Sequence, residues 1–149
     1  MEIVESEIEK ILPAYRAAIH CELLSEAEVK QLLVQRRQGE SRLIKREVAR
    51  EDYVNYVARD SMLLKLIQKR RKKTNYTHKL GEIEYVFVGK LNRVMKRAHR
   101  LWPDDERIWA THIALLSKWN KRTQLSKLYE AGIEIYSLKS LAKLWSIVN

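Results

Sequence analysis

The chain has 149 residues, a formal net charge of +10 and 46% apolar residues, which is enough for one domain with a hydrophobic core. Glycine and proline together number only six, which excludes a turn-rich β protein, and the abundant helix-forming residues favour long helices. No apolar run approaches the roughly 20 residues of a membrane-spanning helix, and the acidic N-terminus lacks the pattern of a secretory signal. Cys21 is the single cysteine, which excludes an intrachain disulfide and favours a reducing compartment.

Positive charge is concentrated in the middle of the sequence. Residues 1–24 carry two basic and five acidic side chains, residues 25–100 carry twenty and nine, and residues 101–149 carry seven and five. The central balance of +11 predicts attraction to a polyanion such as RNA, DNA or an acidic protein segment.

Apolar residues at steps of three and four predict a first helix over about Val4 to Ile19. Pro13 lies inside this pattern and lacks a backbone donor, so we expect a kink or a restart there. The acidic residues that alternate with this stripe, Glu5, Glu7 and Glu9, are expected to form a solvated face.

Ser25 and Glu28 have the spacing of a capping box, which predicts the start of a second helix. This helix either ends at Gly39 or continues to about Arg46, since one interior glycine costs only about 1 kcal/mol relative to alanine.

A third helix is predicted from Glu51 to the basic run at residues 69–73, because acidic residues suit a helix N-terminus and basic residues suit its C-terminus. Residues 74–80 are predicted to form a loop. Three further helices are expected over about 82–101, from Asp104 or Asp105 to about Asn120, and from about 123 to 136. A turn over 137–140 then leads into a last helix, which contains Trp145.

The second half of the sequence contains an internal repeat. Residues 91–102 (LNRVMKRAHRLW) and 125–136 (LSKLYEAGIEIY) align without a gap at an offset of 34, and the following apolar–Trp pairs, 108–109 and 144–145, recur at an offset of 36. A helical period of this length is typical of an α-solenoid, whose units bury their apolar faces against one another. We therefore predict an all-α solenoid of antiparallel helix pairs, with an N-terminal helical cap at residues 1–50 and HAT/TPR-like repeats at 51–149.

Aromatic and small residues at repeated positions are predicted to be the packing anchors of these units, because an aromatic ring can span the gap to a neighbouring helix and a small residue lets two helices approach. These anchors are Tyr53, Tyr56, Trp109, Trp119, Trp145, Leu91, Ala98, Leu125, Tyr129 and Gly132.

The unit containing Trp109 and residues 125–132 (LSKLYEAG) resembles the HAT (half-a-TPR) repeat of RNA-processing proteins. A second resemblance is more specific and covers nearly the whole chain: it looks like the N-terminal region of the Utp-six family, HAT-repeat proteins of the UTP-B subcomplex of the small-subunit processome. The segments that carry it are 8–13 (IEKILP), 24–30 (LSEAEVK), 51–57 (EDYVNYV), 64–71 (LKLIQKRR) and 118–127 (KWNKRTQLSK).

The resemblance implies a non-catalytic scaffold in ribosomal small-subunit precursor assembly and pre-rRNA processing, located in the nucleolus of the nucleus. Its implied partners are other UTP-B subunits and processome proteins, with pre-rRNA or guide RNA reached through the basic middle region. The alternative hypothesis is a direct RNA-binding module of another HAT-repeat protein. Family members continue with further repeats, and the last repeat here is incomplete, so we expect the chain to be a fragment, a truncated product or the N-terminal part of a longer array.

The candidate contacts for RNA or an acidic partner are basic residues of the central region, although a charge run is also the usual composition of a solvated helix end. They are Arg36, Arg37, Lys69, Arg70, Arg71, Lys72, Lys73, Arg93, Lys96, Arg97 and Arg100.

The sequence contains none of the short motifs typical of nucleotide-binding loops, serine hydrolases or zinc proteases, so we predict no enzymatic activity and no cofactor. His20 and Cys21 are adjacent and have no second cysteine or HxxxH pair, so no metal site is expected. His99 and His112 are interpreted as partner-contacting or core-edge residues.

Overall fold

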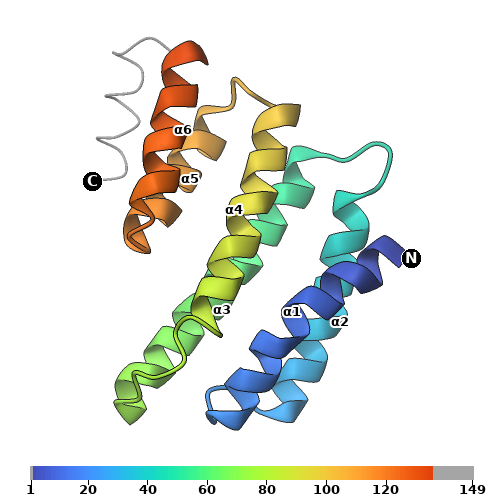
Figure 1. Ribbon diagram of the computed structural model, residues 1–149. Coiled ribbons are helices and arrows are strands. Elements are labelled where there is room, and N and C mark those ends of the chain that lie inside the picture. Colours follow the sequence, from blue (N-terminus) through green and yellow to red (C-terminus); the bar gives the residue numbers. More distant parts are fainter. Residues whose placement is uncertain (1, 136–149) are drawn as a thin grey trace. The chain divides into compact units, whose positions relative to one another are not determined.

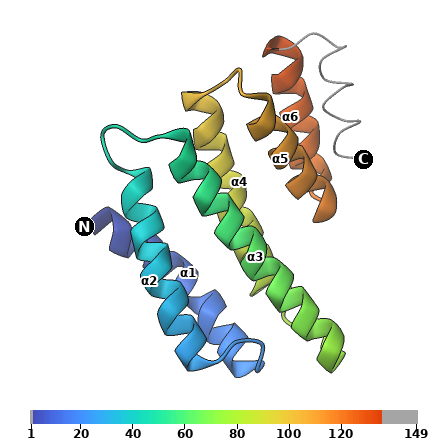
Figure 2. The same cartoon turned by 180° about the vertical axis from the view of Figure 1, so that it is seen from behind.

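The computed structural model describes residues 2–135, with side chains to residue 132, and every regular element in this part of the chain is a helix (Figure 1). The helices are α1 (Glu2–His20), α2 (Glu26–Leu43), α3 (Arg50–Thr74), α4 (Glu84–Leu101), α5 (Glu106–Lys118) and α6 (Arg122–Ile135). The contacts between neighbouring helices α1 and α2, α2 and α3, and α5 and α6 are antiparallel, which confirms the all-α class (Figure 2).

Two compact units divide the chain, and each is described by itself. The N-terminal unit is Met1–Leu91 and the C-terminal unit is Asn92–Asn149. The division falls within α4, whose first half therefore belongs to the N-terminal unit and whose second half belongs to the C-terminal unit.

Helix α1 is continuous through Pro13, so the expected restart is absent. The proline side chain is exposed, while Ile8, Ile11 and Tyr15 are 1–2% exposed on the opposite face. The three- and four-residue periodicity thus identified the buried face of this helix correctly.

Helix α2 begins with the predicted capping box. The Glu28 N–H donates to Ser25 Oγ at 3.1 Å, and the Ser25 N–H donates to Glu28 Oε1 at 2.9 Å. The helix continues past Gly39 to Leu43. A Cβ atom at Gly39 would lie 3.1 Å from a ring carbon of Tyr56, so the glycine allows α2 and α3 to approach each other at this point.

Helix α3 carries its acidic residues at the start and its basic run at the end, as predicted. The Ala49 N–H donates to Asp52 Oδ2 at 2.9 Å at the N-terminus. Asn75 ends the helix in the left-handed conformation, with φ of 58°. A loop follows up to Ile83, and Phe87, Val88 and Leu91 on the first half of α4 complete the core of the N-terminal unit.

Helix α5 is capped by Asp105, one of the two predicted residues, whose side chain accepts from the Arg107 N–H at 3.0 Å. Trp109, Ile113, Leu116 and Leu128 form the core shared by α5 and α6. Two of the four apolar pairs matched by the 34-residue offset are buried alike, Val94 with Leu128 and Ala98 with Gly132. In the other two pairs, Leu91 and Met95 are buried, whereas their counterparts Leu125 and Tyr129 are half-buried.

Candidate interaction sites

The predicted packing anchors of the described part of the chain lie in the interior or at its edge. Tyr53, Tyr56, Leu91, Ala98, Trp109, Trp119 and Gly132 are buried, and Leu125 and Tyr129 are half-buried against the core shared by α5 and α6. Trp145 lies outside the described residues. Two anchors have polar roles that the pattern did not indicate, since Trp109 Nε1 donates to the carbonyl oxygen of Pro103 at 2.9 Å and the Tyr56 hydroxyl donates to Glu40 at 2.5 Å.

A histidine pair lies beside Trp109 in the C-terminal unit. His112 is 1% exposed, so it belongs to the core and not to its edge. Its Nδ1 lies 2.9 Å from Nε2 of His99, and its Nε2 lies 2.6 Å from Oδ1 of Asn92. The sequence indicated neither the pairing nor the role of Asn92, because these residues come from two helices and lie 13 and 20 positions apart.

Burial lowers the pKa of both imidazoles, to about 4 for His99 and about 3 for His112. With Asn92 Oδ1 as acceptor, His112 carries its proton on Nε2 and accepts at Nδ1 from His99. The pair is therefore neutral at pH 7 and holds α4 against α5 by hydrogen bonds.

Two of the predicted RNA or acidic-partner contacts have buried side chains in the structure. Arg36 is 6% exposed, and Arg71 is 8% exposed. Arg71 forms a two-point ion pair with Glu84, at 2.5 and 2.9 Å, and also donates to the carbonyl oxygens of Tyr76 and His78. Its guanidinium anchors the loop after α3 and is not available to a polyanion.

The other candidate basic residues remain at the surface to different degrees. Arg70 is part-exposed and forms a two-point ion pair with Glu28, at 2.8 and 2.7 Å. Arg37 pairs with Glu5 at 3.0 Å, and both of these side chains are exposed. Lys69, Lys72, Lys73, Arg93, Lys96 and Arg100 are exposed, and Arg97 is half-buried. These exposed residues remain candidate contacts for RNA or an acidic partner, but they lie in different parts of the chain.

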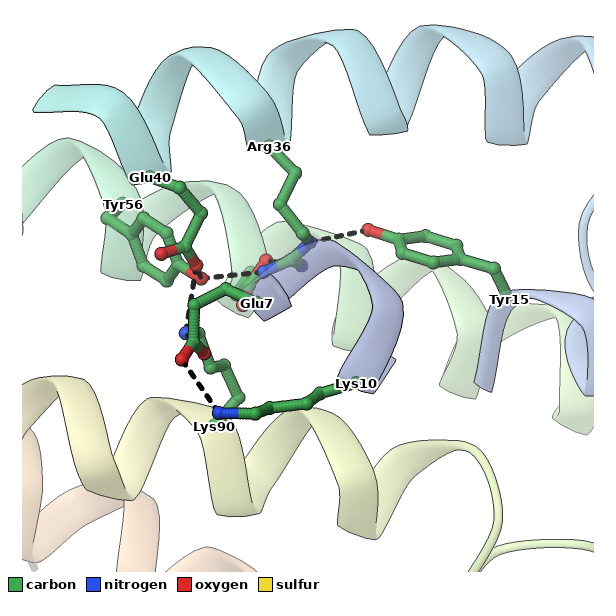
Figure 3. Close-up of polar contacts among 8 residues, drawn as sticks. Glu7, Lys10, Tyr15, Arg36, Glu40, Tyr56 and Lys90 are labelled. Atoms are coloured by element: carbon green, nitrogen blue, oxygen red, sulfur yellow. Dashed lines mark hydrogen bonds and ion pairs between the residues drawn. The ribbon is translucent and has the colours of Figure 1, made fainter. Parts of the chain in front are cut away.

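A cluster of polar side chains, all of them buried except the part-exposed Glu7, joins all four helices of the N-terminal unit (Figure 3). We call it the polar cluster, and its members are Glu7, Tyr15, Arg36, Glu40, Tyr56, Asp60 and Lys90. Arg36 donates to the hydroxyls of Tyr15 and Tyr56, each at 2.8 Å, and to the Asp60 carboxylate.

Lys90 closes the same cluster from α4. Its Nζ lies 2.6 Å from Glu7 Oε2 on α1 and 2.9 Å from Glu40 Oε1 on α2 (Figure 3). The hydrogen bond from Lys90 lowers the pKa of Glu7 to about 2, which corrects the expectation that Glu7 belongs to a solvated face. Burial raises the pKa of the Asp60 carboxyl, and the adjacent Arg36 guanidinium opposes that rise.

Sequence reasoning missed Glu40, Asp60 and Lys90, although a signal was present. Asp60 continues the step of three and four that runs through Tyr53, Tyr56, Leu63 and Ile67, so it falls on the apolar stripe of α3. A charged residue on such a stripe indicates a buried partner of opposite charge.

The polar cluster joins its four helices through hydrogen bonds and ion pairs, and four of its members also line a cavity of about 360 Å³. Among the described residues, no group of three or more His, Cys, Asp or Glu is arranged to hold a metal ion. No helix in residues 2–135 combines the length and apolar character needed to cross a membrane.

A family model and three similar proteins all carry the same description. A family model described as "U3 small nucleolar RNA-associated protein 6" matches residues 8–90. The "U3 small nucleolar RNA-associated protein 6 homolog" of Mus musculus and that of Homo sapiens are each 36% identical over 138 residues, which cover 93% of this chain and 23% of the relative. The protein named "U3 small nucleolar RNA-associated protein 6" in Schizosaccharomyces pombe is 23% identical over 146 residues, which cover 98% of this chain and 30% of the relative. The chain thus spans less than a third of the length of these relatives.

Proposed function

Because the chain belongs to the U3 small nucleolar RNA-associated protein 6 family, we propose that it is a non-catalytic scaffold in ribosomal small-subunit precursor assembly and pre-rRNA processing. It acts by protein–protein interaction within a large nucleolar ribonucleoprotein, the small-subunit processome, and its partners are other UTP-B subunits. The observation that carries this proposal is the family match over residues 8–90, the region that contains every member of the polar cluster except Glu7.

The proposed mechanism is the stacking of HAT-like helix pairs. Residues 1–50 form the cap, α3 with α4 and α5 with α6 form two repeats, and the next repeat begins in residues 136–149, beyond the described part of the chain. The antiparallel packing of α5 on α6 supports this arrangement, as does the shared burial of two pairs related by the 34-residue offset, Val94 with Leu128 and Ala98 with Gly132.

Exposed apolar side chains supply surfaces for protein partners. Val34 on α2 is 54% exposed, and Val54 and Met62 on α3 are 48% and 70% exposed. Large apolar side chains left at the surface of a stacking protein suit burial by a neighbouring chain.

A pull-down of the tagged chain from nuclear extract, with and without nuclease, tests the proposal. We expect processome proteins to remain bound after nuclease treatment, because protein contacts hold them. Loss of all such partners after nuclease treatment would contradict the scaffold mechanism and favour the alternative, a direct RNA-binding module. Their absence in both conditions would contradict both.

A further inference from the structure

A groove in the C-terminal unit combines several cations that have no carboxylate partner among the described residues. Its volume is about 480 Å³, and side chains of α4, α5 and α6 line it. Helix α4 contributes Lys96 and Arg100, and α6 contributes Lys127. We call this the basic groove.

None of these three cations forms an ion pair with a carboxylate of the described residues, and no Asp or Glu is among the residues that line the basic groove. Like charges around one concave surface repel each other and raise the local concentration of anions. The position therefore favours an anionic ligand, whose charge would offset this repulsion.

Neutral hydrogen-bonding groups accompany the cations. Thr123 and Gln124 at the start of α6 line the same groove. Lysine and arginine combined with hydroxyl and amide groups form the donor set that proteins use on the phosphate backbone of nucleic acids. Lys96 and Arg100 are four residues apart, which corresponds to a rise of about 6 Å along the helix, and Arg93 extends the same exposed row by one turn.

The groove is poorly suited to stacking with bases. Trp109, the one aromatic ring among its lining residues other than the two histidines, is 2% exposed, and its Nε1 already donates to Pro103. A ring that is buried in this way offers no free face to a nucleobase. Contacts would therefore be made to the backbone, without base-specific readout.

An acidic peptide is the competing occupant, and the apolar residues of the basic groove do not favour it. Peptide docking normally depends on an apolar side chain that enters an accessible apolar pocket. Leu128 is only 8% exposed, and none of the large apolar side chains that are exposed in the described part of the chain lines this groove.

We propose that the basic groove binds the phosphate backbone of RNA. This inference rests on the proposed function, because it adds an RNA contact to the scaffold role. It narrows the eleven basic candidates of the sequence to a site centred on Lys96 and Arg100, and it adds Lys127, which the sequence analysis did not select.

The test uses the 149-residue chain and a fluorescently labelled oligouridylate, with affinity measured by fluorescence anisotropy between about 50 and 200 mM salt. The groove variant combines Lys96→Ala, Arg100→Ala and Lys127→Ala. We expect its affinity for the RNA to fall at least about tenfold at the lower salt, and the slope of log affinity against log salt to flatten by about 2, since each phosphate contact on a single strand contributes about 0.7.

The matched control combines Arg107→Ala, Lys118→Ala and Arg122→Ala, which remove the same charge from exposed positions of the C-terminal unit outside the groove. We expect this variant to retain most of the affinity and of the slope. Equal losses in both variants would overturn the proposal, because net charge alone would then explain the binding. Thermal melts by circular dichroism must show both variants folded.

Polyglutamate, as a competitor, separates the two kinds of occupant. We expect it to displace the RNA only weakly. Polyglutamate could instead displace the labelled RNA as strongly as unlabelled RNA of the same charge does, with the same sensitivity to the groove variant. That result would overturn the RNA proposal in favour of an acidic peptide. In the nuclear-extract pull-down, we expect the groove variant to keep its nuclease-resistant protein partners. Loss of RNA binding would therefore contradict the RNA site without contradicting the scaffold role, and loss of the protein partners would contradict the scaffold role.

Discussion

Arg36 occupies the centre of the polar cluster, where its side chain and that of its ion-pair partner Asp60 are only 4% and 6% exposed. Removing one member of a buried ion pair leaves the other charge without compensation, which typically costs about 3–5 kcal/mol. We expect Arg36→Ala to lower the free energy of unfolding by about this amount, as measured by urea denaturation followed by circular dichroism.

The neighbouring Arg37 supplies a matched control, since it undergoes the same substitution one position away. Its partner is Glu5, and the two side chains are 45% and 52% exposed. An exposed ion pair contributes about 0–1 kcal/mol, so Arg37→Ala should change the free energy of unfolding little. Similar losses for the two variants would show that the Arg36 pair does not have the stabilising role assigned to it.

The histidine pair makes the stability of the C-terminal unit depend on pH. The pKa of His99 is about 4 and that of His112 about 3 in the folded chain, below the ordinary value of 6.5, so the unfolded chain binds more protons between these values. The stability from the neutral pair is therefore fully present above about pH 6.5 and is lost as the pH falls towards 4. Protonation of His112 at Nδ1 would also place a proton where His99 donates.

We expect the free energy of unfolding of the C-terminal unit to fall by up to about 1.4 kcal/mol per pH unit for each of these histidines between about pH 6.5 and 5. This free energy is measured by urea denaturation at each pH, with tryptophan fluorescence as the signal. The double variant His99→Gln with His112→Gln should flatten this dependence while leaving the exposed His20 and His78 in place. An unchanged slope in the double variant would assign the pH dependence to other groups.

At the scale of elements, the start of α2 depends on the Ser25 hydroxyl. Ser25→Ala removes the acceptor for the Glu28 N–H, and loss of such a cap costs about 1 kcal/mol. Ser41 is exposed within the same helix, where alanine has the higher helix propensity, so Ser41→Ala should stabilise the chain slightly. Urea denaturation should therefore show opposite signs for one substitution made at two places in α2. The same sign at both positions would contradict this account of the cap.

These elements show which features can be predicted from sequence. The capping box at Ser25 and Glu28 and the cap at Asp105 are formed within a few residues, so local spacing was sufficient to predict them. Gly39 was ambiguous, because its role is to allow the close approach of a Tyr56 ring from α3, which local spacing does not reveal.

The polar interior could not be predicted from local patterns, because its pairs join distant positions. Arg36 and Asp60 are 24 residues apart, and Lys90 and Glu7 are 83 apart. From the sequence, Arg36 and Arg71 were counted among the surface cations, whereas both are buried and paired with carboxylates inside the N-terminal unit. The anchors Tyr53 and Trp109 are buried, and the pattern indicated them because a large aromatic ring gains from burial whatever its exact partner.

For the whole molecule, the two compact units carry different spectroscopic reporters. All four tryptophans of the sequence fall within Asn92–Asn149, whereas five of the seven tyrosines, at positions 15, 53, 56, 76 and 85, fall within Met1–Leu91. Tryptophan fluorescence therefore reports on the C-terminal unit alone, while far-ultraviolet circular dichroism reports on the helices of both units.

This separation predicts how each unit responds to its own perturbation. Arg36→Ala acts inside the N-terminal unit, so it should lower the urea midpoint of part of the circular dichroism signal and leave the tryptophan midpoint nearly unchanged. Acidification towards pH 5 acts through His99 and His112, so it should lower the tryptophan midpoint first. Continuous α4 runs across the division, and if it couples the two cores into one cooperative unit, both signals will shift together in both experiments. Coincident shifts would overturn the prediction of independent units, and separate shifts would establish that each core is stabilised by its own buried polar residues.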